Sequence, residues 1–93
     1  NSYLNKEERK AAICLYNAIK KGRDIFDNGV RNADIILKEA RNIIKGEPLA
    51  VIDYVKVCDI DTLDDLEDIA GRVLLTLAVK IGKTRLLVNY ILG

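Results

Sequence analysis

The sequence predicts an α+β domain of two layers, in which a helical hairpin packs on a small, mainly antiparallel three-stranded sheet. Apolar residues recur at helical spacing in the first half of the chain, and the second half changes to the two-residue alternation of strands. Ninety-three residues suffice for one domain with its own core, because a chain of this length buries about 60–68% of its unfolded surface.

The first predicted helix begins after Asn5, because the side chains of Asn5 and Glu8 can form a capping box. It ends at Asn28-Gly29, where the glycine can take the left-handed cap conformation. Gly22 weakens it locally. Its apolar stripe consists of Ala11, Leu15, Ala18, Ile19 and Phe26, with Ala12 and Tyr16 beside them.

A second helix is capped by Asn32 and stopped by Gly46 and Pro48. Its polar side chains lie opposite an apolar stripe, which predicts that one face packs on a core. The stripe consists of Ala33, Ile36, Leu37, Ala40, Ile43 and Ile44.

Ala50 to Cys58 is rich in β-branched residues and predicts a strand, although Asp53 and Lys56 fall on different faces of it. The acidic segment 59–71 follows as a connection, with turn chemistry at its start. Its helix-like apolar spacing is expected to tuck it against the core through Leu63, Leu66 and Ile69.

Two further strands, Arg72 to Ile81 and Thr84 to Leu92, are joined by the loop Gly82-Lys83, and a leading glycine suits a type II′ turn. Counting outward from the loop places eight side chains on one face, which is expected to be core. They are Leu75, Leu77, Val79, Ile81, Thr84, Leu86, Val88 and Tyr90. The other face is mixed and pairs Lys80 with Arg85.

Composition excludes several classes of function. A net charge of +1 provides no electrostatic reason to expect a nucleic-acid partner. The longest apolar run, 73–79, is far shorter than the ~20 residues of a membrane-spanning helix, so no membrane partner is expected. Methionine is missing, so we expect a processed chain or a piece of a longer one. Histidine is missing too, which removes the commonest acid–base group and metal ligand.

No segment contains a complete catalytic or metal-binding set. Gly82-Lys83-Thr84 resembles the end of a phosphate-binding loop, but Leu77 stands where that motif needs glycine and a strand follows. The acidic connection lacks the central glycine of a calcium loop. Cys14 and Cys58 match no redox or zinc spacing and are expected to be buried apolar residues in a reducing cytosol, with a disulfide or a reactive thiol as alternatives.

Lys80, Lys83 and Arg85 cluster at the tip of the predicted β-hairpin. Like charges opposite each other are mildly destabilising, and this cost raises the alternative that the tip contacts phosphate or an acidic partner surface. The preferred interpretation is a solvated tip that relaxes by splaying its side chains.

Four ordered segments carry a family resemblance. They are Asn1-Ser2-Tyr3-Leu4 with Glu7-Glu8-Arg9-Lys10-Ala11-Ala12, Glu47-Pro48-Leu49-Ala50 with Ile52-Asp53-Tyr54-Val55, Asp59 with Thr62 and Leu63, and, in the hairpin, Leu75, Leu77-Ala78-Val79, Ile81-Gly82-Lys83-Thr84-Arg85-Leu86 and Asn89. In this order and spacing they resemble the carboxy-terminal domain of pantothenate synthetases (pantoate–β-alanine ligases).

The resemblance implies that residues 1–93 form a lid hinged over the active site of a Rossmann-like amino-terminal domain. Such enzymes are cytoplasmic homodimers that condense pantoate with β-alanine, using ATP and Mg²⁺, through a pantoyl adenylate. The family's serine–arginine motif precedes the position of Asn1, so no catalytic residue is carried over and the isolated chain is expected to be inactive. Asn1 is expected near ATP, as are Lys80, Lys83 and Arg85.

One alternative comes from another functional class. The chain could be a free-standing interaction module that dimerises through its sheet and catalyses nothing.

Overall fold

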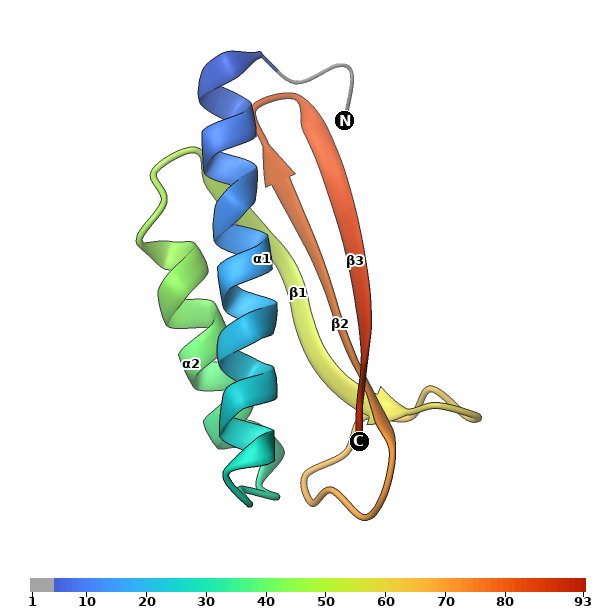
Figure 1. Ribbon diagram of the computed structural model, residues 1–93. Coiled ribbons are helices and arrows are strands. Elements are labelled where there is room, and N and C mark those ends of the chain that lie inside the picture. Colours follow the sequence, from blue (N-terminus) through green and yellow to red (C-terminus); the bar gives the residue numbers. More distant parts are fainter. Residues whose placement is uncertain (1–4) are drawn as a thin grey trace.

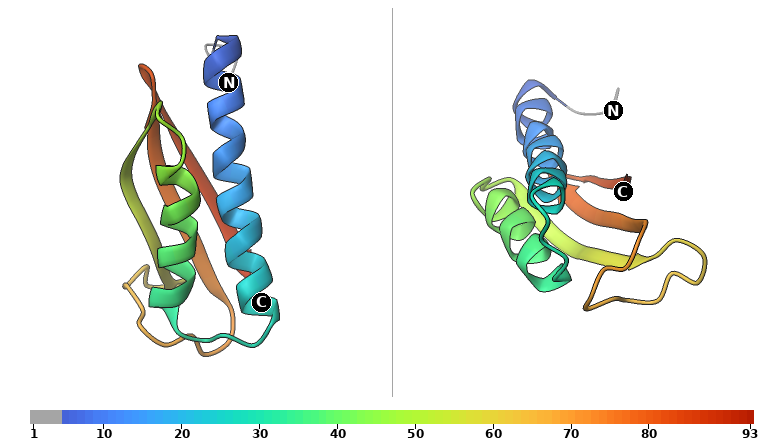
Figure 2. Two further views of the ribbon diagram at one scale, coloured as in Figure 1. Left: turned by 90° about the vertical axis from the view of Figure 1, so that its left-hand side faces the viewer. Right: turned by 60° about the horizontal axis from the view of Figure 1, so that its bottom comes forward.

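Two helices cover one face of a three-stranded sheet in the computed structural model, which describes residues 5–93 (Figure 1). The chain order is α1 (Lys6–Asp27), α2 (Ala33–Lys45), β1 (Ala50–Asp59), β2 (Val73–Ile81) and β3 (Thr84–Leu92). The strands lie in the order β1-β2-β3, and both pairings are antiparallel. The views in Figure 2 place both helices on the same side of the sheet, which confirms the predicted two-layer α+β class.

The two helix starts follow the predicted capping chemistry. The Asn5 side chain accepts from the Glu8 amide at 2.8 Å, and the Glu8 carboxylate accepts from the Asn5 amide at 3.1 Å. The Asn32 side chain accepts from the amide of Asp34 at 2.9 Å. These bonds satisfy amides that have no partner within the helix, so both helices begin where the sequence predicts.

The predicted apolar stripes face the sheet. Tyr16, beside the stripe of α1, points outward and is 66% exposed. Gly29 has a φ of +98°, the left-handed conformation expected of the residue after the cap. The buried stripe residues are Ala11, Leu15, Ala18, Ile19 and Phe26 of α1 and Ala33, Ile36, Ala40 and Ile44 of α2.

A β-bulge explains the imperfect alternation of β1. The register shifts between Ile52 and Tyr54, so Asp53 is the extra residue and has no partner on β2. An inserted residue reverses the facing of everything after it. Val55 and Val57 therefore face the core, where each is 1% exposed, instead of the outer side that strict alternation from Ile52 would give them.

The segment between β1 and β2 is not the helix-like element that its apolar spacing suggested. Leu63 was expected to tuck against the core, but it is 62% exposed and has a φ of +63°. The Leu66 amide donates to the Val57 carbonyl at 3.0 Å, and the Ile69 amide to the Arg31 carbonyl at 2.8 Å. Because these bonds join the segment to other parts of the chain, it runs extended; Ile69 is buried and Leu66 half-buried.

The hairpin register agrees with the prediction pair by pair, from Ile81 opposite Thr84 to Leu75 opposite Tyr90. Gly82 has a φ of +60°, as the first position of a type II′ turn requires. The inner residues of β2 are fully buried, whereas the inner residues of β3 from Thr84 to Tyr90 are half-buried because β3 is an edge strand beside α1 (Figure 1). The fully buried set is Leu75, Leu77, Val79 and Ile81.

Gly22 has a packing role that the sequence did not reveal. A Cβ at this position would lie 2.9 Å from Leu75 Cδ2 and 3.3 Å from Ile36 Cγ2. These atoms belong to β2 and α2, so Gly22 sits where the three elements meet. The glycine lowers helix propensity and in exchange allows α1 to approach its neighbours closely.

We expect Leu77→Ala to lower the free energy of unfolding by about 2–5 kcal/mol, because a fully buried leucine leaves a cavity. Leu87→Ala is the matched control, since Leu87 lies on the same hairpin and is 59% exposed. Its effect should stay within about 0.5 kcal/mol. Urea denaturation followed by circular dichroism measures both, and equal losses would contradict the burial of this face.

Gly22→Ala should destabilise the domain although alanine favours helices. Overpacking costs roughly 1–3 kcal/mol and exceeds the helix gain of up to about 1 kcal/mol. Gly46→Ala is the control, because its nearest contact would be an ordinary 3.4 Å to the Ile43 carbonyl. A stabilised Gly22→Ala variant in chemical denaturation would contradict the close approach of α1.

Candidate functional site

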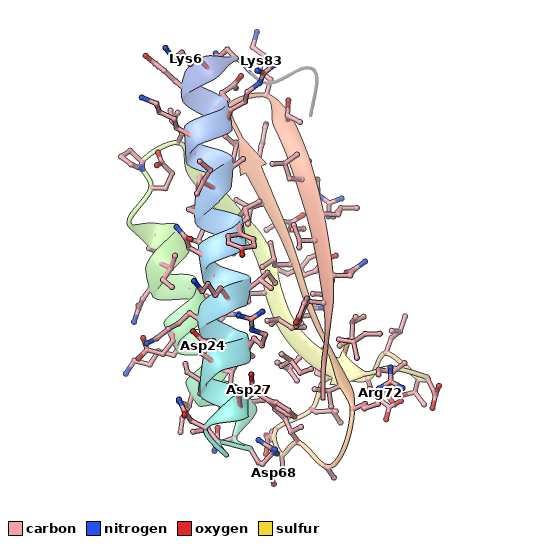
Figure 3. All side chains as sticks on the ribbon, viewed as in Figure 1. Lys6, Asp24, Asp27, Asp68, Arg72 and Lys83 are labelled. Carbon is pink, nitrogen blue, oxygen red and sulfur yellow. The ribbon has the colours of Figure 1, made fainter. Side chains whose placement is uncertain are left out.

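The hairpin tip lies beside the amino-terminal end of α1. The Glu8 carboxylate, held by the capping box, packs directly on Gly82, and a Cβ at Gly82 would overlap it. Figure 3 shows Lys6 and Lys83 at this same end of the molecule. Gly82 is therefore required twice, for the positive φ of the turn and for the approach of Glu8.

The three predicted phosphate-contacting cations divide into two kinds. Arg85 is held within the domain, since its Nη2 lies 2.8 Å and its Nε 3.0 Å from Asp53 Oδ2. Lys80 and Lys83 are exposed, and no salt bridge in the described part of the chain includes them. The Asp53 carboxylate thus neutralises Arg85, which relieves the repulsion between Arg85 and Lys80, its cross-strand neighbour.

Asp53 is the site residue that sequence reasoning missed. It stands on the bulge of β1, and its carboxylate meets Arg85 from β3, on the far side of β2. The sequence indicated the irregularity of β1, because the alternation of apolar and polar residues breaks between Asp53 and Lys56. Identifying Arg85 as the partner of Asp53 required the order of the strands in the sheet. Asn1, also expected near ATP, lies outside the described residues.

A hollow of about 400 Å³ opens on the sheet face that the helices leave uncovered. At its floor, Thr76 Oγ1 donates to Asn89 Oδ1 across the hairpin at 2.5 Å. Lys56 Nζ lies 5.3 Å from the centre of the Tyr54 ring. The lining residues are Tyr54, Lys56, Cys58, Leu63, Leu74, Thr76 and Asn89.

A second hollow, of about 390 Å³, lies beside β1 between α2 and the acidic connection. Four carboxylates line it, from Asp34, Asp53, Asp65 and Glu67. Two cations, Arg41 and Lys56, also line it, and Arg41 Nη2 donates to the Val55 carbonyl at 3.2 Å. The carboxylates outnumber these cations and repel phosphate, so the electrostatics of this hollow disfavour a nucleotide.

The acidic turn after β1 has a structural role. Asp59 Oδ1 accepts from the amides of Asp61 at 2.8 Å and Thr62 at 2.9 Å. The bonds from the Thr62 and Asp61 backbone stabilise the carboxylate and lower the pKa of Asp59. Within residues 5–93, no group of three or more metal-ligating side chains could hold a metal ion.

Both cysteines are free thiols with little nucleophilic character. Cys58 is buried as expected, whereas Cys14 is only half-buried. Burial, and secondarily the charge of Glu47, raises the pKa of Cys14, and burial followed by Asp65 raises the pKa of Cys58. A raised pKa reduces the thiolate fraction. Neither of the two described helices has the length and apolar character that a membrane crossing requires.

Comparison with known proteins decides the family. Residues 1–91 match the family model described as pantoate-beta-alanine ligase. The chain belongs to this family. The pantothenate synthetase of Desulfatibacillum aliphaticivorans is 48% identical over 92 residues, which are 99% of this chain and 33% of that protein. That of Roseiflexus sp. strain RS-1 is 47% identical with the same coverage.

Solved structures of pantoate–β-alanine ligases share the fold. A crystal structure of the enzyme from Thermus thermophilus matches with a TM-score of 0.90 and 27% identity. The match covers 97% of this chain and 32% of that chain. The present chain therefore spans about a third of the length of the ligases that it resembles.

A double-mutant cycle of Asp53→Ala and Arg85→Ala should show a coupling of roughly 0.2–1 kcal/mol, since both side chains are about half exposed. The coupling should shrink as salt is added, because solvent-exposed charges are screened. A cycle of Asp53→Ala with Lys83→Ala serves as the control and should show no coupling. Equal coupling in the two cycles, measured by thermal denaturation, would argue against a specific pair.

Proposed function

We propose that this chain is the carboxy-terminal lid domain of a full-length pantoate–β-alanine ligase. Family membership over residues 1–91 is the observation that carries the proposal. The one-third share of the relatives' length supports the assignment to one domain of a larger enzyme. The remaining length would form the amino-terminal nucleotide-binding domain that contains the catalytic machinery.

The proposed reaction condenses pantoate with β-alanine in two steps. The pantoate carboxylate attacks the α-phosphate of ATP, which forms pantoyl adenylate and releases pyrophosphate. The β-alanine amine then attacks the acyl carbon and displaces AMP, which yields pantothenate. Both steps develop negative charge on phosphate, and the adenylate must be kept from water. A domain that closes over the site supplies both cover and positive charge.

The exposed lysines at the hairpin tip are the best candidates for that charge. Lys83 stands in the turn and Lys80 at the end of β2, and both are free of salt bridges within residues 5–93. Arg85 contributes indirectly, because its bond to Asp53 holds it across the sheet. Its expected role is to position the tip.

ATP and Mg²⁺ are the cofactors proposed for the full-length enzyme. The described part of this chain offers no set of three or more side chains that could hold a metal ion. We further propose that the full-length enzyme is a cytoplasmic homodimer, in keeping with the family resemblance.

A free-standing module that dimerises through its sheet is the second candidate function. The uncovered sheet face, with exposed Leu87 and Val51, favours it. The gene sequence upstream of codon 1 separates the two candidates. A nucleotide-binding domain there supports the ligase, and a start codon or signal peptide supports the module.

In the full-length enzyme, Lys83→Ala should lower kcat by about tenfold to a hundredfold. This loss does not exceed the loss of kcat caused by removing one hydrogen-bond donor to the transition state. Lys80→Ala should act in the same direction. Lys45→Ala is the matched control, because Lys45 is an exposed lysine on α2. The assay follows AMP release with ATP, pantoate and β-alanine, and the isolated chain serves as a blank. Unchanged kcat in both tip variants would leave the tip as a solvated turn.

A further inference from the structure

The Glu8 carboxylate is shared between the start of α1 and the turn of the hairpin. Its Oε1 accepts from the Asn5 amide at 3.1 Å, which completes the capping box. Its Oε2 is the atom nearest to the place that a Cβ of Gly82 would occupy. Glycine carries a hydrogen in that place, so a Gly82 Cα hydrogen points at Oε2 in a weak C–H···O contact. The two oxygens of one side chain therefore serve two different elements.

The burial pattern at the start of α1 singles out the same side chain. Glu8 is half-buried, whereas its charged neighbours in the helix are exposed. These neighbours are Lys6, Glu7, Arg9 and Lys10. No salt bridge within residues 5–93 includes Glu8, so packing on the turn accounts for its burial and an ion pair does not.

The turn depends on this contact for its place beside the helix. Gly82 and Lys83 are both exposed, and the pairing of Ile81 with Thr84 closes the hairpin behind them. Strand pairing sets the distance between β2 and β3, but it does not set the position of the tip relative to α1. The three atoms nearest to the place of a Gly82 Cβ all belong to Glu8, so this side chain is what the turn meets on the helix.

We infer that Glu8 is a positioning residue for the reaction, which acts through the turn to hold Lys83 toward the phosphates of the nucleotide. This inference rests on the proposed function, in which Lys83 supplies positive charge at the tip. A cation stabilises a transition state most when it is held in place before the charge develops. Lysine has a flexible side chain, so the placement of its backbone limits where the ammonium group can reach.

Three substitutions in the full-length enzyme separate positioning from helix stability. Glu8→Ala removes the contact with Gly82 together with one bond of the capping box. Asn5→Ala is the matched control, because it removes the other bond of the box but keeps the backbone amide that holds Glu8. Glu8→Gln keeps the shape of the side chain and an oxygen that can accept from the Asn5 amide. Both alanine variants should lower the melting temperature, since each loses a capping bond.

The kinetics of these variants should differ although both alanine variants are less stable. Glu8→Ala should lower kcat about threefold to tenfold and by no more than Lys83→Ala, because it displaces that lysine without removing it. Asn5→Ala and Glu8→Gln should retain most of the kcat. Glu8→Ala should have no further effect on the Lys83→Ala background, because losses that pass through one group are not additive. AMP release measures all four enzymes.

Hydrogen exchange provides a readout that does not depend on turnover. The full-length variants are labelled in heavy water, and the peptide that contains Gly82 and Lys83 is followed by mass spectrometry. Its amides should exchange several-fold faster in Glu8→Ala than in Asn5→Ala, because only the first substitution releases the turn from α1.

Several outcomes would overturn the inference. They are equal tip exchange in the two alanine variants, equal loss of kcat in Glu8→Ala and either Asn5→Ala or Glu8→Gln, and additive losses in the double variant. An active enzyme in which Lys83→Ala leaves kcat unchanged would also overturn it, since Glu8 would then have no cation to position. A full-length enzyme without turnover refutes the proposed function instead, and tip exchange still decides whether Glu8 holds the turn.

Discussion

The burial of the inner side chains of β2 beneath both helices is the interaction on which the rest of the structure depends. Leu75, Leu77, Val79 and Ile81 are each 0% exposed, and the other two strands pair with β2 on either side. A two-stranded hairpin is marginal in water, and an isolated helix as short as α2 is also marginal. Each layer is stable because it removes the apolar face of the other from water.

This arrangement determines where chemistry can be presented. Because the helices occupy the inner face, the outer face and the hairpin tip are the surfaces of the sheet left for a partner or a ligand. The cap of α1 fixes the tip, since the Glu8 carboxylate that completes the capping box also packs on Gly82. The start of α1 and the hairpin turn therefore pack on each other, which explains how the exposed Gly82-Lys83 loop is held in place.

A single inserted residue links strand pairing to electrostatics. The bulge at Asp53 restores Val55 and Val57 to the core and at the same time supplies the carboxylate that binds Arg85. That pair ties the first strand to the last across β2 and neutralises Arg85 beside Lys80. In the proposed lid, the lysines are then the cations left to meet phosphate.

Local patterns in the sequence determined the helices, their caps, the turn and the register of the hairpin, because each depends on side chains a few positions apart. The family resemblance likewise required only the order of residues and agrees with the family assignment. Tertiary structure alone decided three features: the close approach at Gly22, the Asp53–Arg85 pair and the exposure of Leu63. The first two depend on partners distant in the chain. For Leu63, the backbone bonds between its connection and the end of β1 outweighed a helical period of only three residues.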